Sequence, residues 1–302
     1  MARVADVDVT SAPAPPLTRR RGWPRPDANV ARRGLYLLVL CGLSVIFVYP
    51  FVWAVSASLK PTDQVFDNRL IPREWAFENY TKVWDAAKLL TWLMNSLYVG
   101  FAAAAAVTIS SAIVAFGFAY FRFPGRTALF GLVLATMMLP FAVTMIPVFL
   151  IWDRLGLVNT QYPLWAMNLF GSAFYIFLLR QFFLGIPREL FEAARVDGDN
   201  FFTMFWRIAL PLAKPALVVA FIFELQASWN DLLKPLIYLQ DPNLYTIPLG
   251  LKTILDGFGQ GGEHQWEIVV ASTVITTIPM ILIFFLGQRY FVEGIATSGR
   301  KG

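Results

Sequence analysis

The sequence predicts an all-α, polytopic membrane protein with six transmembrane helices. Its 302 residues are 57% hydrophobic and 15% charged, which leaves too little polar surface to cover a water-soluble globule. Six apolar stretches are each long enough to cross a hydrocarbon core of about 30 Å, which takes roughly 20 helical residues. They lie at about 35–59, 94–121, 128–151, 162–184, 215–239 and 268–291, so residues 35–302 are expected to form one six-helix domain.

Residues 1–34 precede the first span and are expected to form a disordered, basic cytoplasmic tail. The segment is rich in proline and arginine, so it cannot bury enough apolar surface to offset the entropy lost on ordering. The apolar run that follows resembles the core of a signal peptide, but it is longer than such a core and five further spans follow it. We therefore expect a helix that is retained in the membrane.

The positive charges predict the orientation. Most of the 25 lysines and arginines fall in segments 1–34, 122–127, 185–214 and 289–302, which share one side of the membrane if both termini are inside. Cytoplasmic flanks of spanning helices retain positive charge, so both termini and segment 185–214 are expected in the cytosol. Because the excess charge lies on these flanks, membrane lipid is an expected partner and nucleic acid is not.

The chain lacks the side chains and motifs of an enzyme or a metal site. It has one cysteine, Cys41, and one histidine, His264. It also lacks the Gly-x-x-x-x-Gly-Lys-Ser/Thr run that holds nucleotide phosphates. We therefore expect no catalytic residues, no metal and no cofactor bound by this chain.

A polar segment with a glycine turn lies between the fourth and fifth spans. It reads Glu-Ala-Ala-Arg-Val-Asp-Gly-Asp-Asn-Phe over residues 192–201. Pro187 is typical of the first turn of a helix, and Gly198 can adopt positive φ and so end that helix. Asp199 or Asn200 can then cap a second helix, which Pro211 stops. The predicted structure is a compact helix–turn–helix outside the membrane.

This segment has the residues of a docking element. Ala193 and Ala194 permit close backbone approach, Phe191 or Phe201 supplies apolar area, and Glu192 offers a charge-assisted contact to a basic partner. The alternative is an amphipathic segment that lies on the lipid headgroups without a protein partner.

Polar residues within the fifth span are candidates for a substrate path. They are Glu224, Ser228, Trp229, Asn230 and Asp231, with Lys234 close behind. A charge in lipid costs about 2.5–3.5 kcal/mol, so these groups are expected to face a cavity, another helix or the outer interface. Trp229 could stack on a sugar ring, and Asp231 could pair with Lys234 at i,i+3. Alternatively, Trp229 and Lys234 anchor the span at the interface and Glu224 locks two subunits together.

Several short sequence motifs together resemble those of a known protein family, and the resemblance covers most of residues 35–300. Beside the polar segment with its later Ile-x-x-Pro, they are Asn95-Ser-Leu97, Phe121-Arg-Phe-Pro-Gly-Arg126, Leu155-Gly-Leu-Val-Asn-Thr160 and Trp229-Asn-Asp-Leu-Leu-Lys-Pro-Leu236. In this order and spacing they resemble the carbohydrate-uptake family of ABC importer permeases, in particular its MalG-like subunits. One departure is Asp199, where the family usually has alanine.

The resemblance implies a permease subunit of an ATP-driven importer for a sugar or sugar-like solute, in the inner membrane of a prokaryote. Glu192, Ala193, Ala194, Asp197, Gly198 and Pro211 would form the coupling helix segment that docks into an ATP-hydrolysing subunit. The implied partners are a second homologous permease subunit in a heterodimer, two copies of an ATPase that carries ATP and Mg, and an extracytoplasmic solute-binding protein.

Two questions stay open on the sequence. The outer loop 60–92 carries Trp75, Phe77, Tyr80 and Trp84, which suit either an interfacial anchor or part of a docking surface for the solute-binding protein. The alternative function is a self-contained, proton-coupled secondary transporter with Glu224 or Asp231 as the proton site.

Overall fold

The computed structural model describes residues 28–86, 88–257 and 265–298, and these residues are helical with connecting turns. No strand occurs in these ranges, and the predicted all-α class is confirmed. The chain divides into two units, residues 1–51 and 52–302. The predicted tail lies outside the described residues up to position 27.

Helix α1 (Ala28–Ser58) supplies the first candidate span. Its part from Arg32 to Ser58 is long and apolar enough to cross a membrane. The helix begins at Ala28, ahead of the predicted start of the first span at 35, so the last residues of the predicted tail are helical.

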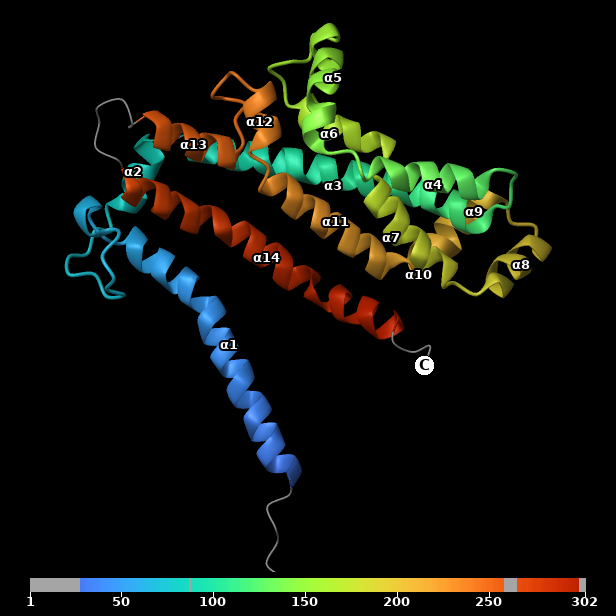
Figure 1. Ribbon diagram of the computed structural model, residues 1–302, viewed down its shortest axis with the longest axis horizontal. Coiled ribbons are helices and arrows are strands. Elements are labelled where there is room, and N and C mark those ends of the chain that lie inside the picture. Colours follow the sequence, from blue (N-terminus) through green and yellow to red (C-terminus); the bar gives the residue numbers. More distant parts are fainter. Residues whose placement is uncertain (1–27, 87, 258–264, 299–302) are drawn as a thin grey trace, which may run out of the picture. The chain divides into compact units, whose positions relative to one another are not determined.

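The second unit is built around four helices that pack on one another. They are α3 (Leu89–Tyr120), α7 (Ala173–Leu184), α11 (Lys214–Trp229) and α14 (Trp266–Ser298). Helix α3 contacts α7 and α11, α11 also contacts α14, and Figure 1 shows α3, α11 and α14 side by side. A Cβ added at Gly100 would lie 2.8 Å from Leu225 Cδ1, so glycine permits the close approach of α3 and α11. Small residues serve this purpose where membrane helices pack.

The third predicted span, 128–151, is sharply bent. It consists of α4 (Arg126–Thr136) and α5 (Phe141–Arg154), whose axes differ by 94°. Pro140 stands at the break with extended backbone, because proline has no N–H to donate and disfavours helix in the residue before it. The fourth predicted span, 162–184, contains α6 (Tyr162–Trp165), the 3₁₀ turn η2 (Ala166–Phe170) and α7.

The fifth predicted span, 215–239, extends beyond the end of the helix that the structure contains. Helix α11 stops at Trp229, and a separate helix α12 (Leu233–Tyr238) follows. Before α11, the helical stretch Phe201–Leu212 forms an angle of 77° with it. In the described part of the chain, four helices are long and apolar enough to span a membrane, or six if each bent pair is one span.

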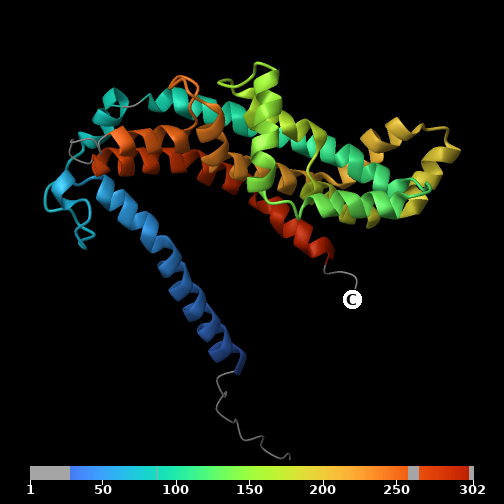
Figure 2. The ribbon, with the colours of Figure 1, turned by 45° about the horizontal axis from the view of Figure 1, so that its top comes forward.

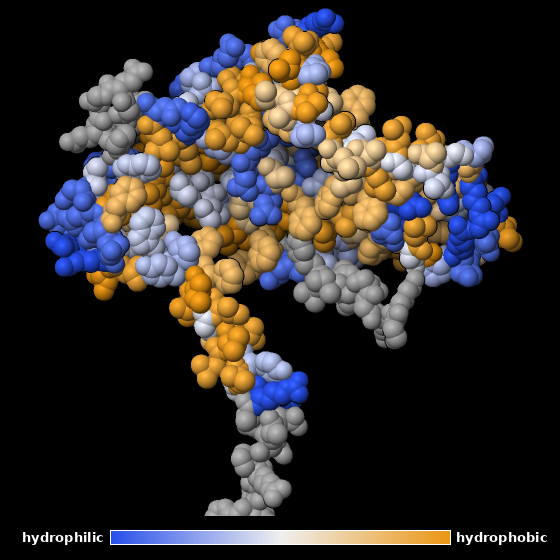
Figure 3. Space-filling model, viewed as in Figure 1, coloured by the Kyte–Doolittle hydropathy of each residue, from blue (hydrophilic) through white to orange (hydrophobic). Residues whose placement is uncertain are grey.

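The remaining helices lie near the two ends of the second unit or between its main helices. They are η1 (Thr62–Gln64), α2 (Asn79–Ala86), α8 (Arg188–Val196), α9 (Phe201–Met204), the π-helical turn η3 (Phe205–Ala209), α10 (Leu210–Leu212) and α13 (Ile247–Gly257). Figure 3 shows hydrophilic residues gathered around α2 with its preceding loop and around α8, with a mainly hydrophobic surface between them. This distribution suits a unit that crosses a bilayer between its two polar ends.

Candidate functional site

The helix–turn–helix predicted from the sequence is formed by α8 and α9. Pro187 is the N-cap of α8, Glu189 lies in its first turn and Arg195 in its last, as the helix dipole favours. Asn200 caps α9 by accepting a hydrogen bond from the Thr203 N–H at 2.8 Å. Of the two predicted capping residues, Asn200 rather than Asp199 therefore takes this part.

The turn between α8 and α9 depends on Gly198, which has φ +88°. Its N–H donates to the Arg195 carbonyl at 3.2 Å, and the Asp199 N–H donates to the Ala194 carbonyl at 2.9 Å. These two bonds form the Schellman motif, which satisfies the last carbonyls of a helix and requires a left-handed residue after its end. The local sequence Asp-Gly-Asp thus fixes the angle between the two helices.

A cluster of aromatic side chains packs the α8–α9 segment against the C-terminal end of α3. Phe116 contacts Phe191 at 6.0 Å and Phe205 at 5.2 Å between ring centroids, and Tyr120 contacts Phe191 at 5.1 Å. Phe121 contacts Phe201 at 4.9 Å. Each such pair adds about 0.5–1.5 kcal/mol beyond the burial of its area. Figure 2 shows α8 and α9 in gold at the end of the bundle that α3, α7 and α11 form.

Burial divides the predicted docking residues into two groups. Phe191 is 4% exposed and Ala194 is 7% exposed, and both lie in the core that α3 and α7 share. Of the two residues predicted to supply apolar area, Phe191 is enclosed by its own chain, whereas Phe201 is 47% exposed and stays the candidate. Glu192, Ala193 and Asp197 are exposed, and Val196 is 87% exposed. The segment thus has one anchored face and one free face.

Pro211 lies at the bend that leads from this segment into α11. It follows the π-helical turn η3 and belongs to α10, after which the chain changes direction at Ala213. Proline cannot donate the backbone hydrogen bond that a continuing α-helix needs, and local π adjustments are a usual compensation in membrane helices.

Glu224, the first substrate-path candidate, is bound within its own chain. Its Oε1 accepts a hydrogen bond of 2.6 Å from Asn168 Nδ2, and the Tyr175 side chain lies near the same carboxylate. Asn168 Nδ2 also donates to the Ala103 carbonyl at 3.2 Å. This polar cluster joins α3, η2, α7 and α11, which shows how a carboxylate is accommodated in an apolar region.

The other path candidates lie near the end of α11. Trp229 is 6% exposed and packs with Trp92, Ile247 and other buried residues, so it is enclosed and the suggestion that it stacks on a sugar is wrong. Asn230 is the C-cap of α11, and its Nδ2 donates to the Gln226 carbonyl at 2.9 Å. Ser228 is half-buried beside it.

Asp231 pairs with Lys234 at 3.1 Å, as the i,i+3 spacing predicts. Asp231 also accepts from the Lys234 N–H at 3.2 Å. Asn230 and Lys234 do not share one helix, because the chain is non-helical between α11 and α12.

A cavity of about 160 Å³ lies where α5, α6, η2 and α12 meet. Its lining includes Lys234 together with Thr144, Asn168 and Tyr238, three residues that no motif or spacing in the sequence marks as part of a site. A polar Asn168 inside an apolar stretch was a visible signal. The convergence of these residues, however, depends on the breaks at Pro140 and after Trp229, which hydropathy does not reveal.

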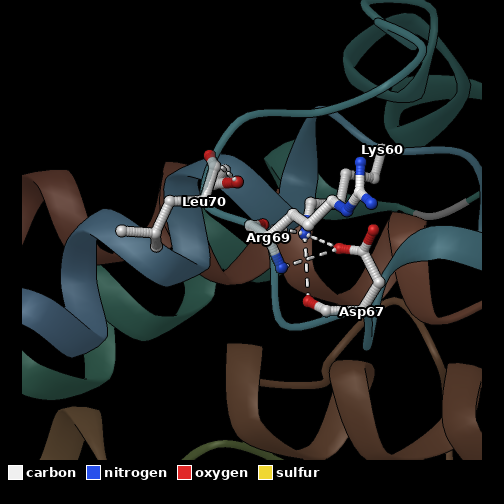
Figure 4. Close-up of polar contacts among 5 residues, drawn as sticks. Lys60, Asp67, Arg69 and Leu70 are labelled. Carbon is white, nitrogen blue, oxygen red and sulfur yellow. Dashed lines mark hydrogen bonds and ion pairs between the residues drawn. The ribbon is translucent and has the colours of Figure 1, made fainter.

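The loop after α1 is organised around a buried lysine (Figure 4). Lys60 is fully buried, and its Nζ donates to Asp67 Oδ1 at 2.5 Å and to the Arg69 carbonyl at 2.6 Å. The hydrogen bond from Lys60 holds the pKa of Asp67 below its ordinary value. Asn79, 1% exposed, donates to the carbonyls of Ser58 and Lys60 at 3.0 and 2.8 Å. These bonds fix the loop against the start of α2.

Exposed aromatic side chains lie on the same loop. Trp75 and Phe77 stack at 5.6 Å and are 54% and 63% exposed, and Trp84 on α2 is 49% exposed. Tyr80 instead points inward, where its hydroxyl lies 2.8 Å from Ser58 Oγ. The exposed rings remain compatible with an interfacial anchor and with a docking surface.

Comparison with known proteins identifies the class of the chain. Residues 108–297 match the family described as binding-protein-dependent transport system inner membrane component. The arabinooligosaccharides transport system permease protein AraQ of Bacillus subtilis is 32% identical over 282 residues, covering 92% of this chain and 98% of AraQ. The sn-glycerol-3-phosphate transport system permease protein UgpE of Yersinia enterocolitica is 34% identical over 279 residues, covering 88% of this chain and 98% of UgpE.

The fold also matches a solved structure. A chain of a bacterial ABC transporter involved in the import of the acidic polysaccharide alginate has a TM-score of 0.74 and 26% identity, covering 89% of this chain and 100% of that chain. The sequence-based identification of an ABC importer permease is confirmed, and the proton-coupled secondary transporter is set aside. The chain belongs to the family of inner membrane components of binding-protein-dependent transport systems.

Proposed function

We propose that this permease subunit carries a sugar or sugar-like solute, and that its α8–α9 segment receives the motion of an ATP-hydrolysing partner on the cytoplasmic side. Both termini lie in the cytosol in this arrangement. The basic residues on the same side of the spans support the orientation. The names of AraQ and UgpE, which refer to arabinooligosaccharides and sn-glycerol 3-phosphate, support the solute class.

The observation that carries the coupling role is the two-faced packing of α8. Phe191 and Ala194 fix one face to the core of α3 and α7, while Glu192, Ala193 and Val196 leave the other face free. A push on the free face is transmitted through the aromatic cluster to the main helices, because packed interiors deform little. An element that merely lies on headgroups does not need this rigid mounting.

Each residue of the segment has a distinct part in the proposed contact. Glu192 makes a charge-assisted hydrogen bond to a basic residue of the partner, and Ala193 lets the partner backbone approach closely. Ala194 anchors the helix, Asp197 and Gly198 set the turn, and Pro211 directs the chain into α11. The carboxylate of Asp199, half-buried at the turn, adjusts the fit to this particular partner.

The complete importer in this proposal contains four further polypeptides. They are a second homologous permease subunit, which forms a heterodimer with this chain, two copies of the ATPase with ATP and Mg, and an extracytoplasmic solute-binding protein. The loop around Lys60 and α2 supports an outer docking role, since it combines a fixed backbone with exposed Trp75 and Phe77.

Uptake by the reconstituted importer tests the proposal. The complete importer in lipid vesicles should take up radiolabelled arabinotriose or sn-glycerol 3-phosphate only when ATP is inside. Glu192→Gln keeps the size of the side chain and removes its charge, so uptake should fall by about tenfold or more, as expected for a lost charge-assisted hydrogen bond.

Glu189→Gln is the matched control for this experiment. Glu189 is exposed on the same helix, one turn from Glu192, and this variant should transport almost as well as the wild type. Equal uptake by the Glu192→Gln variant and the wild type would show that the charge of Glu192 takes no part in the coupling contact. Uptake that persists without ATP would contradict the importer function itself.

A further inference from the structure

The cavity between α5 and α12 has a lining suited to a solute. Phe141, Met145 and other apolar side chains form its walls, and Thr144, Asn168, Lys234 and Tyr238 add polar groups. With about 160 Å³ it holds several water-sized molecules, but it is smaller than the roughly 300 Å³ of drug-sized sites. Its size therefore suits one small ring rather than a whole oligosaccharide.

Asn168 presents a fixed acceptor to this cavity. Both hydrogens of its amide nitrogen are used, by Glu224 Oε1 at 2.6 Å and by the Ala103 carbonyl at 3.2 Å. Within the described part of the chain, no group donates to its Oδ1. Glu224 is thus a positioning residue, because it orients the amide and leaves the carbonyl oxygen of Asn168 for a hydroxyl donor.

Thr144 and Tyr238 add hydroxyl groups with free capacity. Thr144 Oγ1 donates to the Phe141 carbonyl at 3.1 Å and keeps its lone pairs for a donor. Tyr238 is 4% exposed and stacks with Phe149 at 5.9 Å, yet its hydroxyl has no hydrogen-bond partner among the described residues. This hydroxyl is not among the fully buried, unpaired polar atoms of the described residues, so it is accessible and can donate to or accept from a molecule in the cavity.

The charge in the cavity is balanced. Lys234 is the charged residue of the lining, and its ammonium lies 3.1 Å from Asp231 Oδ2. The pair leaves N–H groups that can donate to a hydroxyl oxygen but no net charge for a phosphate or carboxylate. An anion placed here would lose its hydration without gaining a counter-ion of its own.

We propose that this cavity binds one neutral sugar unit of the translocated solute. The proposal rests on the proposed function as a sugar permease and adds the site and the charge class of the solute. A sugar ring has apolar faces for walls such as Phe141 and Met145, and its hydroxyls match acceptors on Asn168 and Thr144 and donors on Lys234 and Tyr238.

Thiol labelling of the assembled importer tests where the sugar lies. With Cys41, the one native cysteine, replaced in Cys41→Ser, the further change Thr144→Cys puts a thiol into the cavity. L-Arabinose should slow its modification by methanethiosulfonate ethylammonium severalfold, and sn-glycerol 3-phosphate at the same concentration should not. The control is Thr136→Cys, because Thr136 also donates to a carbonyl three residues back but does not line the cavity.

Three labelling results would overturn the proposal. They are no protection by arabinose at position 144, equal protection at position 136, and better protection by sn-glycerol 3-phosphate than by arabinose. Asp231→Asn removes the counter-ion of Lys234 and should reverse the preference, so that sn-glycerol 3-phosphate protects position 144. If L-arabinose still protects position 144 better than sn-glycerol 3-phosphate in the Asp231→Asn variant, the role assigned to the ion pair is contradicted.

A transport measurement separates this proposal from the proposed function. Thr144→Val should lower arabinotriose uptake by about tenfold, as for one lost hydrogen bond. Thr136→Val, outside the cavity, should leave both arabinotriose uptake and ATP hydrolysis in the absence of the solute-binding protein unchanged. If the wild type shows no ATP-dependent uptake of any sugar, the proposed function fails. If the wild type imports arabinotriose and Thr144→Val imports it equally well, the cavity assignment fails alone.

Discussion

At the scale of single residues, Gly198 determines the shape of the α8–α9 segment more than any neighbour does. Its φ of +88° lies in the left-handed region, and a Cβ placed there would meet nothing within 4 Å. A substitution therefore strains the backbone without a steric clash. Because the Schellman hydrogen bonds require this conformation, the strain acts on the angle between α8 and α9.

Two substitutions at this position separate backbone strain from the loss of glycine. Gly198→Val should destabilise the turn by about 1–2 kcal/mol, because a β-branched residue resists positive φ, and should lower solute-stimulated ATP hydrolysis. Gly198→Asn should retain most of this hydrolysis, since asparagine tolerates the left-handed region. Both variants should insert into the membrane as the wild type does. Equal hydrolysis by the valine and asparagine variants would show that the turn conformation does not matter.

At the scale of elements, the loop after α1 depends on buried polar groups. Lys60 and Asn79 are almost completely buried and hold the carbonyls of Ser58, Lys60 and Arg69. A buried ion is tolerated only when it is paired and hydrogen-bonded, and here both conditions are met. The loop is consequently built as a fixed surface at the polar end of the unit that carries α2.

Removal of the buried charge should loosen this loop. Lys60→Met leaves the Arg69 carbonyl without its donor and should lower stability by about 3 kcal/mol, measured as a drop in the thermal unfolding midpoint of the importer in detergent. Lys82→Met is the control, because Lys82 is exposed on α2 and should change the midpoint little. Equal midpoints for the two variants would mean that the Lys60 network does not stabilise the loop.

Elements also differ in how far the sequence predicts them. The Gly198 turn, the Asn200 cap and the Asp231–Lys234 pair follow from local chemistry, and the structure contains all three. The 94° size of the bend at Pro140 and the end of α11 at Trp229 do not follow from the sequence, because average hydropathy detects a membrane stretch but not its direction. The burial of Phe191 depends on Phe116, which is remote in sequence, so local patterns cannot reveal it.

At the scale of the whole molecule, the unit of residues 52–302 links three sites. The Lys60 loop lies at one polar end, the α8–α9 segment lies at the other, and the cavity of Thr144 and Asn168 lies among the helices between them. Helix α3 connects these parts, since its residues contact α8 through Phe116 and Asn168 through Ala103. Force on α8 therefore has a packed route to the elements that line the cavity.

The coupling role proposed for α8 requires its free face to contact the ATPase. A benzophenone attached to the thiol of Ala193→Cys, in the Cys41→Ser background, should form a photo-crosslink to the ATPase subunit in the assembled importer. The same label on Asp63→Cys, exposed in η1 near the other polar end, should give no ATPase adduct. The adducts are identified by mass spectrometry. An ATPase adduct at position 193 and not at position 63 is the predicted result. Adducts of position 193 to lipid only would show that α8 lies on the headgroups and would contradict its proposed coupling role.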